Sequence, residues 1–329
     1  MEQEKKKFSI EKLGGQKFIV LLVVIALIAF FSIKSPDFRK YTTFLNIMDF
    51  SYYIVLMAIG VAFPLITGGV DLSIGTGLIC YSLAGGYLVV HCGWPTGAGM
   101  LVSILFGIAI GTLNGFLVGI MNLPPFLATL CTCMITRGLG SICARNFGIS
   151  WPTAGTEGSW FRNIFKITVN GTKIPLGFLW MIVLVLIMSF VLNHTKVGRY
   201  TIAIGSNKEA ATLSGINVKF YHIMAYVISG FFAALASIAY SAVFSTVQPG
   251  TGAGFELEAI GGAIIGGVSA TGGAGSIGGT FIGVFVICLL KTGLPFIGLQ
   301  ANWQQIVTGL VLIAAVLVDI IKRKKSERK

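Results

Sequence analysis

The chain has 329 residues, of which 55% are hydrophobic and only 11% are charged. A soluble chain carries about 25% charged residues, so this composition excludes a soluble globular protein. The formal net charge is +12, but no basic segment is interleaved with aromatic residues in the manner of a nucleic-acid-binding surface. We therefore expect no nucleic acid partner.

Long apolar segments predict an all-α polytopic membrane protein with about ten transmembrane helices. A helix needs about 20 apolar residues to cross ~30 Å of hydrocarbon. The first segment follows a basic N-terminus, as in a signal peptide, but no small-residue cleavage site follows it, so we expect it to remain as a span. The spans are expected at 18–33, 44–67, 74–91, 98–119, 126–143, 175–192, 220–244, 256–269, 278–296 and 302–321.

The distribution of Lys and Arg predicts the orientation of these spans. An even number of spans places both termini on the same side. Most of the 24 basic residues lie in the N-terminal tail 1–17, the polar loop 193–219 and the C-terminal tail 322–329. Because cytoplasmic ends of spans collect Lys and Arg, we expect these three regions to be cytoplasmic and 18–321 to form one transmembrane domain.

Polar side chains inside or beside the spans are the first candidate functional residues. Ionisable groups at membrane depth are costly and usually face a bundle interior or water. Asp71 and Ser73 follow two glycines that allow the helix to break, so they either cap the next helix at the interface or face the interior. The same alternatives hold for Glu256 and Glu258. Arg137 lies about two turns inside its span and is expected to be buried. The tentative pathway or interior set is Asp71, Ser73, Asn114, Arg137, Glu256 and Glu258.

Three further patterns have a structural interpretation. Pro124 and Pro125 predict a helix start, because the first turn of a helix does not use the backbone N–H that proline lacks. The loop 144–174, rich in glycine and aromatic residues, predicts a short interfacial segment on the outer face. The six cysteines lack metal-site spacing and are expected to pack as small apolar residues, with a disulfide between Cys92 and Cys143 as the alternative.

Glycine-rich stretches predict close packing rather than nucleotide binding. The sequence "AIGGAIIGG" at 259–267 has small residues at the spacing that lets membrane helices approach closely. The sequence "GAGSIG" at 273–278 fits G-x-G-x-x-G, but no strand–turn–helix unit surrounds it. We therefore interpret it as a glycine-rich connection and expect no nucleotide to bind there.

The segment "SNKEAATLSGINV" at 206–218 is a polar island between apolar segments. Ser206 and Glu209 form the S-x-x-E pattern of a capping box, and Gly215 suits a helix end. A short helix over 207–214 would have Ala210, Ala211 and Leu213 on its apolar edge. Because so short a helix is marginal in water, it must pack against its own chain or a partner, and these residues alone do not decide which.

The island also contains E-A-A-x-x-x-G, which resembles the cytoplasmic loop signature of the membrane subunits of ABC importers. Other segments narrow the resemblance to the ribose/xylose/arabinose/galactoside group of permeases, from about residue 18 to 321. These segments are "TGGVDLSIG" (67–75), "LPPFLATL" (123–130), "TKVGRYTIAIGSNKEAATLSGINV" (195–218), "GFELEAIGGAIIGGVSATGGAGSIGGTFIG" (254–283) and "VLVD" (316–319).

The resemblance implies a permease subunit in a bacterial cell membrane that catalyses no covalent chemistry. A solute-binding protein would deliver a monosaccharide, two permease copies or two related permeases would enclose the pathway, and a separate cytoplasmic ATPase would bind ATP and Mg²⁺, so this chain would bind no cofactor. The island would be the coupling helix that contacts the ATPase. Its coupling residues would be Ser206, Glu209, Ala210, Ala211, Leu213 and Gly215.

Two other functions fit a polytopic chain. An ion-coupled secondary transporter of a small polar solute would place acids or half-helices at the bilayer midplane, whereas the acids here are expected near span ends. A passive channel would need pore-lining rings of charged or carbonyl groups, and the sequence contains no pattern that indicates such a ring.

Overall fold

The computed structural model describes residues 2–327, with side chains for all of these except 2–14, 301, 319 and 322–327. The side chains of the predicted tail 322–329 and of most of the predicted tail 1–17 therefore lie outside the described residues. The helices are α1 (Glu2–Lys34), α2 (Tyr41–Ile66), α3 (Ile74–Cys92), α4 (Thr96–Gly119), α5 (Pro125–Cys143), α6 (Gly177–His194), α7 (Lys196–Ser206), α8 (Lys208–Leu213), α9 (Val218–Val243), α10 (Phe255–Ile265), α11 (Ile277–Gly293) and α12 (Ala301–Glu327).

Short elements complete the chain. Strand β1 (Ile149–Ser150) pairs antiparallel with β4 (Thr246–Val247), and β2 (Ile167–Val169) pairs antiparallel with β3 (Thr172–Ile174). Three 3-10 helices are η1 (Pro36–Arg39), η2 (Ser159–Ile164) and η3 (Leu294–Ile297). Helix α5 begins at Pro125, which confirms the helix start predicted from the two prolines.

Within residues 2–327, eight helices are long and apolar enough to cross a membrane, which confirms the all-α polytopic fold. They are α1 to α6, α9, and α11 together with η3. Helix α12 has a shorter apolar part, Asn302–Val318. Helix α10 has 11 residues and is about 16 Å long at 1.5 Å per residue, so the full span predicted at 256–269 is wrong. The glycine-rich connection to α11 takes the place of its last four residues, 266–269.

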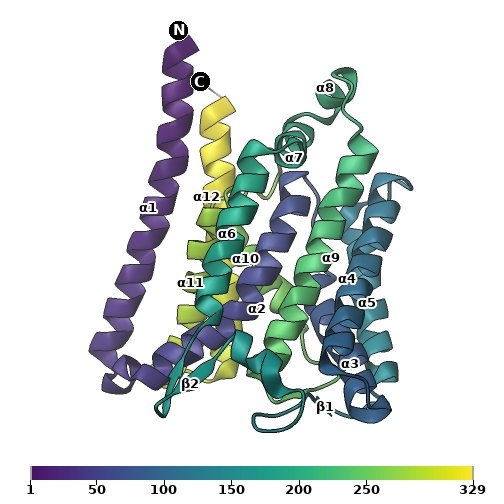
Figure 1. Cartoon of the computed structure of the whole chain (residues 1–329). Helices are drawn as coiled ribbons and strands as arrows, with labels where there is room; N and C mark the ends of the chain where they lie inside the picture. Colours follow the sequence, from purple (N-terminus) through teal and green to yellow (C-terminus); the bar gives the residue numbers. More distant parts are fainter. Residues whose placement is uncertain (1, 328–329) are drawn as a thin grey trace.

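The two ends of the bundle differ in character. The α8 helix lies at one end, together with the N-terminal end of α1 and the C-terminal end of α12. Strands β1 and β2 lie at the other end (Figure 1). We call these the α8 end and the strand end. Because α1 begins and α12 ends at the same end of the bundle, the arrangement agrees with an even number of crossings. The assignment of the α8 end to the cytoplasm stays a prediction.

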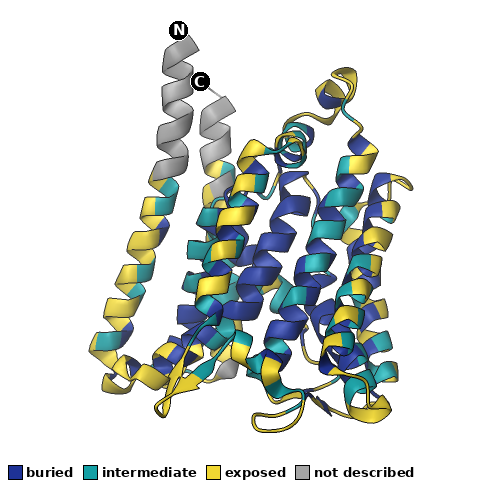
Figure 2. Ribbon diagram, viewed as in Figure 1, coloured by how far each residue is buried: buried dark blue, intermediate teal, exposed yellow. Residues whose placement is uncertain are grey.

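Helix α2 forms the centre of the bundle. Every residue from Ser51 to Ile66 is buried, and Figure 2 shows α2 in dark blue between more exposed helices. Its sequence is apolar on all sides, which is typical of a helix surrounded by protein. By contrast, α1 and α6 keep many large apolar side chains exposed, as expected of helices that face lipid.

Glycines bring helices into backbone contact at two places. Gly107, Gly111, Gly115 and Gly119 recur every four residues on α4, and a side chain at any of them would press against α9. Gly262 on α10 and Gly266 at its C-terminal end lie directly against Gly279 and Gly283 of α11, which confirms the close packing predicted for 259–267. All six cysteines are free, so the alternative of a Cys92–Cys143 disulfide is wrong.

We expect Gly111→Leu to destabilise the bundle, because its Cβ would overlap the carbonyl oxygen of Tyr226 on α9. Overpacking of a tight interface costs about 1–3 kcal/mol, and the backbone of α9 has little room to move. Thermal unfolding of the purified protein in detergent measures the effect. Gly309→Leu is the matched control, because a Cβ at Gly309 meets no atom within 4 Å; equal midpoints for the two variants would contradict the packing argument.

Candidate functional site

Two glycine-rich connections lie side by side in the bundle. Residues 67–73 join α2 to α3, and residues 266–276 join α10 to α11. The amide of Gly273 donates to the carbonyl oxygen of Ile66 at 2.9 Å, and Gly272 lies against the backbone of Gly68. Gly68 and Gly272 have φ of +84° and +89°, which glycine adopts without strain. Non-helical backbone at membrane depth is tolerated where protein covers it, and here the two connections cover each other.

The first connection carries Asp71, whose side chain is only 1% exposed. Its Oδ1 accepts hydrogen bonds from the amide of Ser73 at 3.0 Å and from the Ser73 hydroxyl at 2.7 Å. Its Oδ2 accepts from the hydroxyl of Ser229 on α9 at 2.7 Å. Asp71 and Ser73 therefore lie in the bundle interior, and Ser73 is also the N-cap residue of α3, although its side chain makes no capping hydrogen bond.

Two further helices join this network through Asn114 on α4. Its Nδ2 donates to Ser73 Oγ at 2.9 Å and, more weakly, to Asp71 Oδ1 at 3.4 Å. Its Oδ1 accepts from the hydroxyl of Thr132 on α5 at 2.7 Å. The Asp71 network thus ties the start of α3 to α4, α5 and α9. Sequence reasoning missed Thr132 and Ser229, because small hydroxyl residues are common in membrane helices and only the folded chain shows where they point.

At the α8 end, the polar island forms the end of α7 and the short helix α8. The predicted capping box is wrong by one residue: Asn207 is the N-cap, and its Oδ1 accepts from the amide of Ala210 at 2.9 Å. Ser206 is instead the last residue of α7, and its hydroxyl donates to Ile202 O at 2.9 Å. Gly215 ends the segment at φ +78°, and its amide donates to Thr212 O at 3.0 Å, as predicted for a helix stop.

One part of the apolar edge of α8 is buried and the other part is exposed. Ala211 is buried against Ile204 and Val218, which fixes α8 to α7 and α9. Leu213, in contrast, is 90% exposed at the tip, and Glu209 and Ala210 are exposed as well. The chain therefore supplies its own packing for one side of α8 and leaves the other side uncovered.

The arm formed by α7 and α8 rests on the two glycine connections. A side chain at Gly205 would overlap the carbonyl oxygen of Ile66 and press on the amide of Gly273. The hydroxyl of Ser206 also approaches Gly273 O at 3.4 Å. The base of the arm thus contacts the point where the two connections meet, at Ile66 and Gly273.

Near the strand end, Glu258 and Lys291 form an ion pair between α10 and α11. Lys291 Nζ lies 2.8 and 2.9 Å from the two carboxylate oxygens of Glu258 and 3.2 Å from the Tyr53 hydroxyl. The rings of Phe50 and Phe255 lie about 5 Å from the ammonium group, at 5.0 and 4.9 Å. A charge this deep in a membrane protein needs such a partner, and sequence reasoning found Glu258 without its lysine.

Glu256 and Arg137 are not paired in this way. Glu256 begins α10, and its Oε1 accepts from the amide of Gly254 at 3.0 Å, whereas its buried Oε2 has no hydrogen-bond donor among the described residues. Arg137 lies on α5 and is exposed, so the expectation that it is buried within this chain is wrong. The apolar sequence around Arg137 indicates a span but does not tell which side of the helix other elements cover.

The loop 144–174 forms a packed cap at the strand end, and it contains the short helix η2. Trp151 and Phe161 are almost completely buried, and Trp151 Nε1 donates to Ser82 O at 3.1 Å. Arg162 donates to the carbonyl oxygens of Pro152, Ala242 and Trp151 at 2.6, 2.8 and 3.2 Å. Burial lowers the pKa of this guanidinium, and the three carbonyl groups compensate for the lost water.

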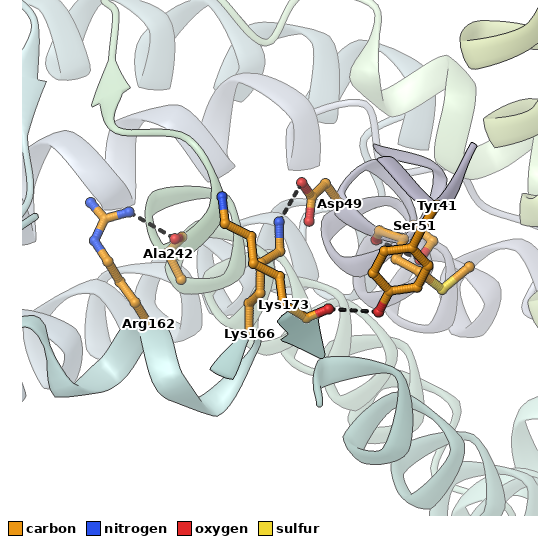
Figure 3. A network of polar contacts seen from close by, with 8 residues as sticks. Tyr41, Asp49, Ser51, Arg162, Lys166, Lys173 and Ala242 are labelled. Carbon is orange, nitrogen blue, oxygen red and sulfur yellow. Dashed lines mark hydrogen bonds and ion pairs between the residues drawn. The ribbon is translucent and has the colours of Figure 1, made fainter. Parts of the chain in front are cut away.

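Side-chain contacts also join this cap to α2. Figure 3 shows Lys166 directed at Asp49, with Nζ 2.7 Å from Oδ2, and the Tyr41 hydroxyl donating to the carbonyl oxygen of Lys173 at 2.6 Å. Arg162 reaches the end of α9 in the same view. The strand end is therefore closed by a rigid surface layer held to both α2 and α9.

Comparison with known proteins gives a family for this architecture. The family described as "Branched-chain amino acid transport system / permease component" matches residues 43–316. The ribose import permease of Escherichia coli (strain K12) is 34% identical over 92% of this chain and 93% of its own length. The D-allose transport system permease of the same strain is 33% identical over 96% and 95%. Its galactose/methyl galactoside import permease is 30% identical over 98% of each chain.

We expect Asp71→Ala to lower the thermal unfolding midpoint strongly, because it leaves the donors of Ser73 and Ser229 without their acceptor. Each orphaned buried donor costs about 1–3 kcal/mol. Asp71→Asn keeps one carbonyl acceptor and should lie between the wild type and the alanine variant. Fluorescence-detected thermal unfolding in detergent ranks the three proteins, and an alanine variant as stable as the wild type would show that the network is dispensable.

Proposed function

This chain belongs to the permease family matched above, and we propose that it forms the membrane pathway of an ATP-driven importer for a monosaccharide. Three relatives that align over more than nine-tenths of the chain are permeases named for ribose, D-allose and galactose or methyl galactoside. The family description names branched-chain amino acids, but full-length identity of 30% or more to sugar permeases favours a sugar as cargo. These relatives give no support to the ion-coupled alternative.

The uncovered side of α8 is the observation that supports an ATPase partner. Leu213 projects from the tip with 90% of its surface exposed, while Ala211 and Gly215 hold the backbone in place. An apolar side chain exposed on a short, anchored helix outside the long apolar helices is available to contact a second protein. We propose that the α8 end is cytoplasmic and that Leu213, Glu209 and Ala210 contact a separate subunit that binds ATP and Mg²⁺.

The opposite end has the properties required of a docking surface for a solute-binding protein. The cap 144–174 is held rigidly by Trp151, Phe161 and Arg162, yet it leaves Phe147 and Trp160 74% and 53% exposed. A fixed surface loses little entropy when a partner binds. In this proposal the binding protein releases sugar at the strand end, and a second permease copy completes the pathway.

Sugar uptake tests the proposed function. The chain is expressed with its ATPase and binding protein in bacterial cells that lack their own ribose, allose, fructose and galactose importers. We expect ATPase-dependent uptake of at least one of these radiolabelled sugars, and the same uptake should survive collapse of the ion gradients when ATP is maintained. Uptake that follows the ion gradient and does not need the ATPase would contradict the proposal.

We expect Leu213→Ser and Glu209→Arg to reduce sugar-stimulated ATP hydrolysis about tenfold, because one loses an apolar contact and the other reverses a charge, and a loss of about 1.4 kcal/mol lowers an affinity tenfold. Both side chains are exposed, so the thermal midpoint of the isolated permease should not change. Asp37→Arg, an exposed substitution outside both α8 and the cap 144–174, is the control and should keep normal hydrolysis. Normal coupling in both α8 variants would rule out α8 as the contact.

A further inference from the structure

A cavity of about 630 Å³ lies between α1 and the rest of the bundle. Its walls come from α1, η1, α2, α6 and α11, and its volume lies in the range of about 300–1,000 Å³ that is typical of ligand pockets. Helix α1 packs on α11 and η1. Figure 1 shows α1 meeting α2 at the strand end and diverging from it toward the α8 end. The cavity lies where these helices leave space between them.

Most of the cavity wall is apolar. Its two sides include Leu21 and Ile28 of α1 and Phe281 and Phe285 of α11. The cavity follows α1 from Leu21 to Ser32, a distance of 11 positions or about 16 Å at 1.5 Å per residue. This length is close to half of the ~30 Å of hydrocarbon in a bilayer. The cavity therefore has the length and the character to hold an acyl chain from one leaflet.

One side of the cavity is open on a surface that faces lipid. Leu21, Ile28 and Phe44 line it and yet are 42%, 44% and 44% exposed. A water-soluble solute could reach these side chains only through hydrocarbon, where its polar groups lose their hydrogen bonds. A lipid molecule can instead leave one chain in the bilayer and place the other between the helices. The position of the cavity thus favours a lipid as its ligand.

Polar residues line only one end of the cavity. Among the described residues that form the wall, the polar ones all lie within residues 32–41, and they are Ser32, Arg39, Lys40 and Tyr41. This segment joins α1 to α2 at the strand end. Basic and aromatic side chains collect at the membrane–water interface. An otherwise apolar cavity therefore reaches the level of the lipid headgroups at one end.

Arg39 supplies an unpaired cation at this polar end. Its Nε donates to the carbonyl oxygen of Ser32 at 2.7 Å, which holds the guanidinium beside the cavity. Its two terminal nitrogens have no acceptor among the residues that the structure describes. Lys40, in contrast, forms an exposed ion pair with Asp37 at 2.6 Å. Helix α2 begins at Tyr41 without an acidic residue in its first turn, so its N-terminus adds positive charge.

We propose that this cavity binds one anionic phospholipid, with the phosphate at Arg39 and one acyl chain between α1, α2 and α11. A guanidinium pairs with phosphate through two parallel hydrogen bonds. A zwitterionic lipid offers the same phosphate but carries a cation next to it, which Arg39 repels. The acyl chain fills the space behind α1 and holds this helix on the bundle. The site is separate from the Asp71 network and from α8, so the inference does not depend on which solute is transported.

Lipid binding to the complete, delipidated chain tests the headgroup contact. Native mass spectrometry in detergent measures one-to-one binding of palmitoyl-oleoyl phosphatidylglycerol and of phosphatidylcholine with the same chains. We expect the anionic lipid to bind about tenfold more tightly, which corresponds to about 1.4 kcal/mol for one charge-assisted contact. Arg39→Gln should remove this preference. The control Arg145→Gln, another exposed arginine near the strand end, should keep it.

A pair of tryptophan variants tests whether the acyl chain enters the cavity. Val24→Trp adds a ring on the side of α1 that lines the cavity. Leu22→Trp adds the same ring to a 49% exposed position of α1 that does not line it. We expect Val24→Trp to weaken the binding of both lipids about tenfold, because the ring occupies the space of the chain. Leu22→Trp should leave both affinities unchanged.

Three results would overturn the proposal. The first is equal binding of the two lipids by the wild type, or an unchanged preference in Arg39→Gln. The second is equal lipid affinity of Val24→Trp and Leu22→Trp, which would place the lipid outside the cavity. The third is a doubled protein mass that Val24→Trp abolishes and Leu22→Trp retains, because a second copy of the chain would then occupy the cavity.

Thermal unfolding in the same detergent keeps the test decisive where a variant folds poorly. A ligand that binds only the folded state raises the unfolding midpoint, so phosphatidylglycerol should raise the wild-type midpoint more than phosphatidylcholine does. Arg39→Lys keeps the charge but loses the planar donors, and its rise should lie between those of the wild type and Arg39→Gln. The same rise with both lipids in the wild type would contradict headgroup recognition.

Discussion

Backbone that leaves the helical path inside a membrane bundle must find hydrogen-bond partners in the protein, since hydrocarbon supplies none. This requirement governs the centre of the molecule. The connection 67–73 leaves α2 beside a second glycine-rich connection, and Asp71 then collects hydrogen bonds from Ser73 and Ser229. Through Asn114 the same network reaches α4 and α5. The positions of four helices thus depend on one buried carboxylate, and a change of one helix alters the partners of the others.

The α7–α8 arm is placed where it can act on this centre. Its base contacts Ile66 and Gly273, which are the residues where the two connections meet. Only Asn207 lies between α7 and α8, so α8 follows directly from the base of the arm. The base of the arm is therefore packed against the end of α2 and the segment that leads into α11, and packed backbone tolerates little compression. This arrangement is well suited to a two-state pathway whose equilibrium a partner shifts.

The sequence was a good guide wherever the signal is local. Hydropathy predicted the long helices, the two prolines predicted the start of α5, and Gly215 predicted the end of the island, because each depends on one stretch of chain. The cap was misplaced because Ser206 and Asn207 are adjacent residues that both suit an N-cap. Tertiary features were out of reach: the exposure of Arg137, the ion pair of Lys291 with Glu258 and the burial of Trp151 each require knowing which helices become neighbours. The length of α10 was also missed, since the glycines that end it carry no charge and do not interrupt the uncharged stretch.

The half-length α10 has a consequence for how the chain is made. A segment of 11 residues with two acids in its first turn is too short to partition into a bilayer as an independent span. Helix α11, in contrast, is apolar and long enough together with η3. The glycine contacts between Gly266 and Gly279 hold the two helices backbone to backbone. We infer that α10 enters the membrane only with α11 as one hairpin during synthesis, so the assembly of this part of the bundle must wait until about residue 297 has left the ribosome.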